Sequence, residues 1–212
     1  MRMKSRYNVQ LAATYNRIAE DWHREHKSDD WWIEGTNEFA QLLPSKATVL
    51  DVGCGAGIES KYLASKGLQV TGIDFSQNML VIARREVPEA TFTLCSIEDS
   101  ASLQKTFDGV FAQAVLLHIA KAKVKTAIRT LVSLIKPGGL IYIAVKRRRA
   151  RQPEEHIIEE DDYGYTYERF FSYYEPEEIK KAMQAAGLTV CYEDIGEYGS
   201  TKWLQIIGRK QL

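Results

Sequence analysis

The sequence has few cysteines, no long hydrophobic run and no excess of charge of either sign. Its three cysteines, Cys54, Cys95 and Cys191, are far apart and form no CxxC pair, which argues against a disulfide scaffold or a thiolate zinc site. The longest apolar run, residues 140–145, is far shorter than the roughly 20 residues that a membrane helix needs. Basic and acidic residues each total 28, so no overall attraction to nucleic acid or to an anionic membrane follows.

The sequence also argues against a signal peptide, an oxidising compartment and a metal site. The amino terminus is basic but no apolar segment follows it, so we expect no signal peptide. Together with the unpaired cysteines, this predicts a reducing, cytoplasmic setting. His23 and His26 could share a metal ion on one helix, but no further ligand set is visible and we predict no metal site. The sequence indicates no oligomeric state.

The chain is long enough for one α/β domain with a substantial core. Hydrophobic residues make up 45% of its 212 residues. In residues 46–145, expected to form the core that binds a ligand, apolar strands alternate with helices, which indicates a doubly wound, mostly parallel sheet. Residues 176–212 are expected to form a helix and then two strands with no helix between them. A hairpin there would complete a seven-stranded sheet with one antiparallel strand.

Two segments lie outside this alternation. Residues 1–45 contain apolar side chains at helical spacing and are expected to form an N-terminal helical cap. Residues 146–175 are expected to form an inserted lid. They begin with five basic residues at 146–151 and six acidic residues at 154–162, and five tyrosines and two phenylalanines then crowd residues 163–174. We interpret that aromatic density as the wall of a substrate pocket, for which the candidate residues are Tyr15, Trp22, Tyr167, Phe171 and Tyr173.

The most informative motif is a strand that runs into a glycine-rich turn at residues 49–57, with the sequence Val-Leu-Asp-Val-Gly-Cys-Gly-Ala-Gly. Glycines allow a tight turn and let a ligand approach the backbone. Ile58 stands where the dinucleotide fingerprint has its third glycine, and Asp51 precedes the first glycine, Gly53, by two residues. A buried carboxylate would repel a pyrophosphate, so this turn favours a cationic ligand without phosphate, such as S-adenosyl-L-methionine.

A second carboxylate supports an adenosine ligand. Asp74 ends the next predicted strand, 21 residues after Gly53. There it can accept hydrogen bonds from ribose hydroxyls, a feature that NAD enzymes share. Asp74 therefore supports an adenosine ligand without distinguishing between the two cofactors.

Taken together, these motifs resemble those of the class I S-adenosylmethionine-dependent methyltransferases, most closely the small-molecule group that includes the ubiquinone/menaquinone-biosynthesis enzymes. The resemblance covers roughly residues 12–210. It is carried by Tyr-Asn-Arg-Ile-Ala at residues 15–19, the glycine turn at 50–57, Gly-Ile-Asp-Phe-Ser at 72–76, Phe-Asp-Gly-Val at 107–110 and Leu-Ile-Lys-Pro-Gly-Gly at 134–139. It implies the Rossmann-like methyltransferase fold, S-adenosylmethionine as cofactor and a small-molecule acceptor.

The resemblance also implies roles for individual residues. The methionine moiety would be held by Asp51 and the turn residues Gly53, Cys54, Gly55 and Gly57, and the ribose by Asp74. The remaining expected cofactor contacts are Phe75 and Met79 beside the adenosine, Ser96, Ile97 and Glu98 in the third motif, and Gln113 after the fourth strand. Ser96 replaces the acid that the family usually has at that position.

Some interpretations stay open at this stage. His118 follows the fourth strand, near the expected acceptor, and is either a general base or a structural histidine. The basic run at 146–151 is either a solvated loop or a phosphate-binding surface, so a tRNA-modifying methyltransferase of the same fold is the alternative function. A third possibility is a cofactor-binding partner protein without catalysis.

Overall fold

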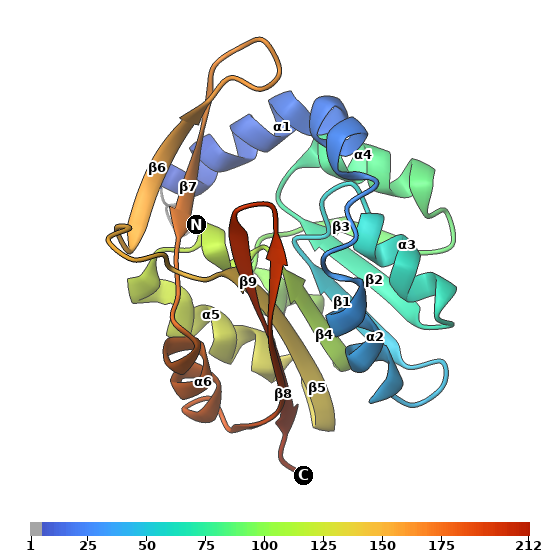
Figure 1. The fold of residues 1–212 in the computed structure, drawn as a ribbon. Helices are drawn as coiled ribbons and strands as arrows, with labels where there is room; N and C mark the ends of the chain where they lie inside the picture. Colours follow the sequence, from blue (N-terminus) through green and yellow to red (C-terminus); the bar gives the residue numbers. More distant parts are fainter. Residues whose placement is uncertain (1–5) are drawn as a thin grey trace.

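A seven-stranded sheet with the order β3-β2-β1-β4-β5-β9-β8 forms the centre of the computed structural model, which describes residues 6–212 (Figure 1). Neighbouring strands from β3 to β5 are parallel, and β9 is antiparallel to both β5 and β8. The predicted doubly wound sheet with one antiparallel strand is therefore confirmed. The strands are β1 Thr48–Val52, β2 Gln69–Asp74, β3 Thr91–Leu94, β4 Phe107–Gln113, β5 Ile135–Lys146, β8 Leu188–Tyr198 and β9 Thr201–Lys210.

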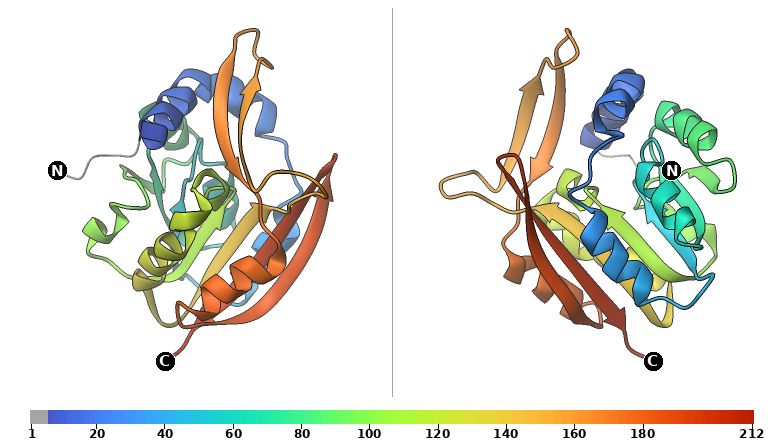
Figure 2. Two further views of the ribbon diagram at one scale, coloured as in Figure 1. Left: turned by 90° about the vertical axis from the view of Figure 1, so that its left-hand side faces the viewer. Right: turned by 45° about the vertical axis from the view of Figure 1, so that its right-hand side comes forward.

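Helices cover both faces of this sheet (Figure 2). On one face, α5 and α6 bury Ile128 and Met183 in the larger part of the core, and on the other face α2 and α3 bury Phe39 and Leu63. The helices are α1 Arg6–His26, α2 Ile33–Gln41, α3 Ile58–Ser65, α4 Gln77–Glu86, α5 Lys121–Ser133 and α6 Pro176–Gln184, with short 3-10 helices at Ser100–Leu103 (η1) and Leu116–His118 (η2). No helix among residues 6–212 has the length and apolarity needed to span a bilayer.

The expected helical cap corresponds to α1 and α2, apart from residues 1–5, which lie outside the described part of the chain. Asn16 fixes α1 to the start of α4, because its Oδ1 accepts hydrogen bonds from Ser76 Oγ at 2.9 Å and from the Asn78 backbone N–H at 3.0 Å. Ser76 is also the N-cap of α4, as its sequence position predicts, and accepts from the Met79 N–H. The helix α1 therefore lies over the carboxyl edge of the sheet.

The insertion at residues 146–175 contains an antiparallel hairpin of its own, β6 Glu155–Glu160 and β7 Tyr167–Ser172. The hairpin stands beside α1 and projects past the carboxyl edge of the sheet (Figures 1 and 2). Side chains join the two: Gln10 Nε2 donates to Glu168 at 2.8 Å, and the Tyr165 hydroxyl donates to Asp21 at 2.8 Å. As a result, α1 and the hairpin together cover the region where β1, β2, β4 and β5 end.

Candidate active site

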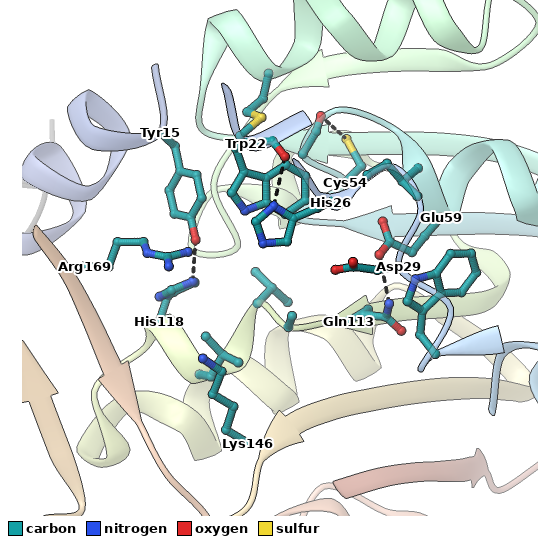
Figure 3. Close-up of a pocket in the computed structure, with 18 of the residues that line it drawn as sticks. Tyr15, Trp22, His26, Asp29, Cys54, Glu59, Gln113, His118, Lys146 and Arg169 are labelled. Atoms are coloured by element: carbon teal, nitrogen blue, oxygen red, sulfur yellow. Dashed lines mark hydrogen bonds between the residues drawn. The ribbon is translucent and has the colours of Figure 1, made fainter. Parts of the chain in front are cut away.

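A cavity of about 270 Å³ lies at the carboxyl edge of the sheet, where the strand order reverses between β1 and β4. This reversal is the usual ligand crevice of doubly wound sheets. Four predicted clusters meet at the cavity: the glycine turn, the end of β2, the end of β4 and part of the aromatic group (Figure 3). Its wall includes the predicted residues Tyr15, Trp22, Gly53, Cys54, Gly55, Asp74, Phe75, Met79, Gln113, His118 and Phe171.

Two glycines of the turn have different structural roles. Both have positive φ, +67° at Gly53 and +50° at Gly55, a conformation that favours glycine. A Cβ at Gly53 would come within 2.5 Å of Val115, so this position must be glycine for the turn to pack. A Cβ at Gly55 would approach only the Trp22 ring, at 3.9 Å. Gly55 therefore presents an uncovered stretch of backbone to the cavity.

Asp74 is oriented by backbone donors and faces the same space. Its Oδ2 accepts the Gly55 N–H at 3.0 Å and its Oδ1 accepts the Ser76 N–H at 2.7 Å. Burial raises the pKa of this carboxyl to about 6, although the backbone donors oppose the shift. Since each carboxylate oxygen has a further lone pair, Asp74 can accept two more hydrogen bonds from a ligand.

Asp51 lies behind the turn and not on the cavity wall. It is only 2% exposed, and its Oδ2 accepts a 2.5 Å hydrogen bond from Ser60 Oγ. Burial and, next, the charge of Glu59 raise its pKa to about 8. Any effect of Asp51 on a ligand therefore passes through the turn and α3.

Two carboxylates on the cavity wall were not identified from the sequence. Glu59, in the first turn of α3, accepts a hydrogen bond from Gln113 Nε2 at 2.9 Å, and Asp29 lies in the loop between α1 and α2. Burial raises the pKa of Glu59, and the charge of Asp29 adds to the shift. An acidic residue two positions after Gly57 was a usable signal for Glu59, whereas nothing in the sequence marks Asp29.

The other predicted residues lie near the cavity but do not line it. Ile97 is buried in the core, and Ser96 Oγ donates to Asp99 at 2.9 Å. Tyr167 donates to Asp162, and the Tyr173 ring packs on Phe171. Gly57 and Glu98 also do not line the cavity. Gly57 has a φ of +83° and lies against the Ala83 backbone, so it contributes to the packing of the turn.

His118 is held in one tautomer. Its Nδ1 lies 2.7 Å from the Phe170 carbonyl oxygen, which can only accept, so Nδ1 carries the proton. Nε2 therefore has a free lone pair, and the Tyr15 hydroxyl, 2.8 Å away, donates to it (Figure 3). Burial lowers the pKa of His118 to about 3, and the charges of Arg169 and Lys146 act in the same direction. The imidazole is neutral at physiological pH.

Two cations lie on the same side of the cavity as His118 (Figure 3). Arg169 on β7 forms a two-pronged ion pair with Glu160 on β6, with both N···O distances 2.5 Å. Lys146, the last residue of β5, contacts the faces of Phe171 and Trp203. Burial lowers the pKa of Lys146 to about 8. The cavity therefore has an acidic side at Asp29, Glu59 and Asp74 and a basic side at Lys146 and Arg169.

The basic run after β5 is not a free cationic surface. Arg148 Nη1 pairs with Glu154 at 2.8 Å, and Arg147 Nε pairs with Glu175 at 3.4 Å. Arg149 Nη2 donates to Ser200 Oγ at 2.9 Å. Acidic neighbours therefore neutralise Arg147 and Arg148, two of the five basic residues of the run, and this pairing gives no support for a phosphate-binding site.

Comparison with known proteins agrees with this arrangement. A family model described as "Methyltransferase domain" matches residues 23–193. The chain belongs to this methyltransferase family. It is 30% identical over 193 residues to a ubiquinone biosynthesis O-methyltransferase of Hydrogenovibrio crunogenus, covering 82% of this chain and 77% of that one. A second relative with the same name, from Methylocella silvestris, is 28% identical over 210 residues, covering 84% of this chain and 80% of that one.

Solved structures share the fold of this methyltransferase. A Burkholderia thailandensis 1,6-didemethyltoxoflavin-N1-methyltransferase with bound S-adenosylhomocysteine has a TM-score of 0.77 and 19% identity, over 97% of this chain and 89% of that one. Magnesium protoporphyrin IX methyltransferase from Synechocystis, with bound S-adenosylmethionine, has a TM-score of 0.74 and 18% identity over 100% of both chains. The chain is thus an S-adenosylmethionine-dependent methyltransferase with a Rossmann-like fold.

The cavity fits this cofactor. S-adenosylmethionine carries an ammonium and a sulfonium, and the carboxylates Asp29, Glu59 and Asp74 line the space beside the exposed Gly55 backbone. The lone pairs of Asp74 match a ribose diol. Opposite charge in a partly buried site favours binding of the cation.

Cofactor affinity should depend on pH through Asp74. Above about pH 6 the carboxyl is ionised and both oxygens accept; below that pH it takes up a proton and one acceptor becomes a donor. The dissociation constant of S-adenosylhomocysteine, measured by titration calorimetry from pH 5 to 8, should therefore increase as the pH falls below 6. Asp74→Asn, which cannot ionise, should reduce this dependence. Equal pH profiles for the two proteins would contradict the assignment.

Proposed function

We propose that this methyltransferase transfers the methyl group to a hydroxyl oxygen of a small aromatic acceptor. The observation that carries the proposal is the fixed, neutral imidazole of His118, whose Nε2 lone pair meets a hydroxyl group at 2.8 Å on the cavity wall. An acceptor hydroxyl that replaces the Tyr15 hydroxyl at Nε2 would donate to the same lone pair. Aromatic side chains around it, including Phe75 and Phe171, suit a planar acceptor. The names of the relatives, which are O-methyltransferases, support an oxygen acceptor.

The acidic side of the cavity is the proposed cofactor half. Asp74 would bind the ribose hydroxyls, Phe75 and Met79 would flank the adenosine, and Glu59 with Asp29 would pair with the ammonium. Asp51 would act through Ser60 and the turn, since it does not reach the cavity. The expected adenine contacts, Ser96, Ile97 and Glu98, follow β3, whose last residue, Leu94, is in register with Asp74. They belong to the same edge of the sheet.

The reaction needs positioning and removal of one proton. S-adenosylmethionine supplies a methyl group that is already activated by the sulfonium. The chain must align the acceptor oxygen in line with that methyl group and exclude water, which α1 and the β6–β7 hairpin do by covering the cavity. His118 Nε2 would accept the hydroxyl proton as the oxygen gains the methyl group. Because the sulfonium loses its positive charge in the same step, uptake of a proton by His118 leaves the net charge of the site unchanged.

Two further proposals concern the compartment of the enzyme and the role of residues 146–175. We propose a cytoplasmic enzyme, since Cys54 and Cys191 are free thiols and Cys54 is buried beside the cavity. We also propose that residues 146–175 act as a lid, because Arg169 and Phe171 of this segment form part of the cavity wall. Tyr167 and Tyr173 would support these two wall residues from behind.

The acceptor atom is tested with matched small molecules. Catechol, 2-aminophenol protected at oxygen, and thiophenol present a hydroxyl, an amine and a thiol on the same ring. With labelled S-adenosylmethionine, we expect label on the catechol oxygen, identified by mass spectrometry, and at least about tenfold less on the amine or the thiol. Total tRNA from cells that lack this protein is a further arm and should stay unlabelled. Labelling of the amine, the thiol or the tRNA in preference to the hydroxyl would contradict the proposal.

A further inference from the structure

Lys146 is a partly buried cation without an anionic partner. Within residues 6–212, no carboxylate oxygen lies within 4.0 Å of its Nζ, in contrast to Arg169 and Lys121, which both form ion pairs. Its contacts are the faces of two aromatic rings, with Nζ 4.3 Å from the Phe171 ring centre and 5.7 Å from that of Trp203. A cation removed from water without a counter-ion is unfavourable. Its retention at a ligand cavity points to an anion that arrives with a ligand.

The charged groups around Lys146 are mostly positive as well. Arg169 and Arg149 both act on it as like charges, and Glu160, the one nearby carboxylate that attracts it, is already bound by two nitrogens of Arg169. His118 on η2 is neutral. Among the residues that the structure describes, no carboxylate other than Glu160 is close enough to attract Lys146.

The position of Lys146 places this charge in the acceptor half. Lys146 ends β5 opposite Trp203 of β9 and extends toward the cavity on the His118 side, away from Glu59 and Asp29 (Figure 3). The cofactor carries a carboxylate of its own, but on the same carbon as the ammonium that we assign to Glu59 and Asp29, so it would lie on the far side of the cavity from Lys146. A ligand bound between His118 and Phe171 would meet Lys146 at its edge.

We propose that Lys146 binds a carboxylate carried by the acceptor, so that the substrates of this enzyme are aromatic hydroxy acids. This inference rests on the proposed function, which gives the acceptor a hydroxyl group, and adds a carboxylate to the same molecule. A single unpaired ammonium matches a monoanion, whereas a phosphate dianion would need a second free cation, and Arg169 is committed to Glu160. The aliphatic stem of Lys146 and the ring of Phe171 would contact the acceptor ring beside the carboxylate.

Binding of small probes separates this inference from the hydroxyl proposal. Benzoate has the carboxylate and no hydroxyl, and benzamide has the same shape without the charge. In the presence of S-adenosylhomocysteine, the wild-type enzyme should bind benzoate at least about tenfold more tightly than benzamide by titration calorimetry. Lys146→Met, which keeps the length of the side chain, should bind the two equally. Lys123→Met, at an exposed lysine of α5, is the matched control and should keep the preference.

Stability of the free enzyme provides an independent readout. If Lys146 is kept for an incoming anion, Lys146→Met removes an unpaired, partly buried charge and should raise the melting temperature by roughly 2–4 °C without ligand. If Lys146 serves only to pack between Phe171 and Trp203, the melting temperature should fall. Such a fall, or a wild-type enzyme that binds benzoate and benzamide equally, would overturn the proposal. Tighter binding of phenyl phosphate than of benzoate would overturn the carboxylate assignment.

Discussion

Replacing Asp74 by alanine should weaken the binding of S-adenosylhomocysteine by about 100-fold or more. Two hydrogen bonds from ribose hydroxyls to a carboxylate are each worth about 1.5–3 kcal/mol, and each 1.4 kcal/mol corresponds to a factor of ten. The substitution also leaves the backbone N–H groups of Gly55 and Ser76 without their acceptor, which loosens the turn that faces the ligand. Both effects act in the same direction.

The effect of Asp74 is best measured as a dissociation constant by titration calorimetry. Thermal unfolding should accompany it, because a lower melting temperature of free Asp74→Ala reports the lost backbone contacts. Glu89→Ala, at an exposed carboxylate after α4, controls for the loss of a negative charge. An affinity of Asp74→Ala equal to that of the wild-type enzyme would mean that Asp74 is not the ribose partner.

Replacing His118 by alanine should lower kcat by about 100-fold, the low end of the usual contribution of a positioned base, because burial lowers the pKa of His118 to about 3 and so weakens it as a base. The affinity for S-adenosylhomocysteine should be nearly unchanged, since His118 lies on the side of the cavity away from Asp29 and Glu59 (Figure 3). Tyr15→Phe should leave kcat nearly unchanged, because the acceptor hydroxyl takes the place of the Tyr15 hydroxyl at Nε2 and the Phe170 carbonyl still fixes the tautomer of the imidazole.

Single-turnover measurements with saturating acceptor distinguish this loss of chemistry from a loss of binding. His156→Ala removes an exposed histidine of β6 and should behave as the wild-type enzyme. If His118→Ala keeps the wild-type rate, His118 has a structural role and the acceptor hydroxyl loses its proton to another group.

The sheet could be predicted from sequence because its parallel strands are buried on both faces. Residues 140–145 of β5 are a continuous apolar run, and β1 and β4 are buried along nearly all of their length. The glycine turn after β1 ends at Gly57, whose φ of +83° would strain a residue with a side chain. Local rules were equally informative at helix starts. Pro176 begins α6 within a capping box formed by Glu175 and Glu178.

The hairpin and most of the charged residues on the cavity wall were not predicted in this way. The strand β6 is largely exposed and carries charged residues on both of its faces, so it has no apolar alternation that marks a strand. The hairpin's partners on α1 are about 150 residues away in sequence, for example Gln10, which donates to Glu168 of β7. Asp29 and Lys146 belong to no motif, and only the fold brings them to one cavity.

The attachment of the β6–β7 hairpin has a consequence for how this enzyme can diversify. The insertion leaves and re-enters the core at one place, where Arg147 and Tyr174 form a single bridge, and its two strands pair only with each other. Insertions, deletions or a complete exchange of the segment between these two points leave the register of the seven-stranded sheet untouched. The hairpin can therefore be exchanged as a unit. Specificity for the acceptor can change through this one surface element, while the residues that bind the methyl donor stay the same.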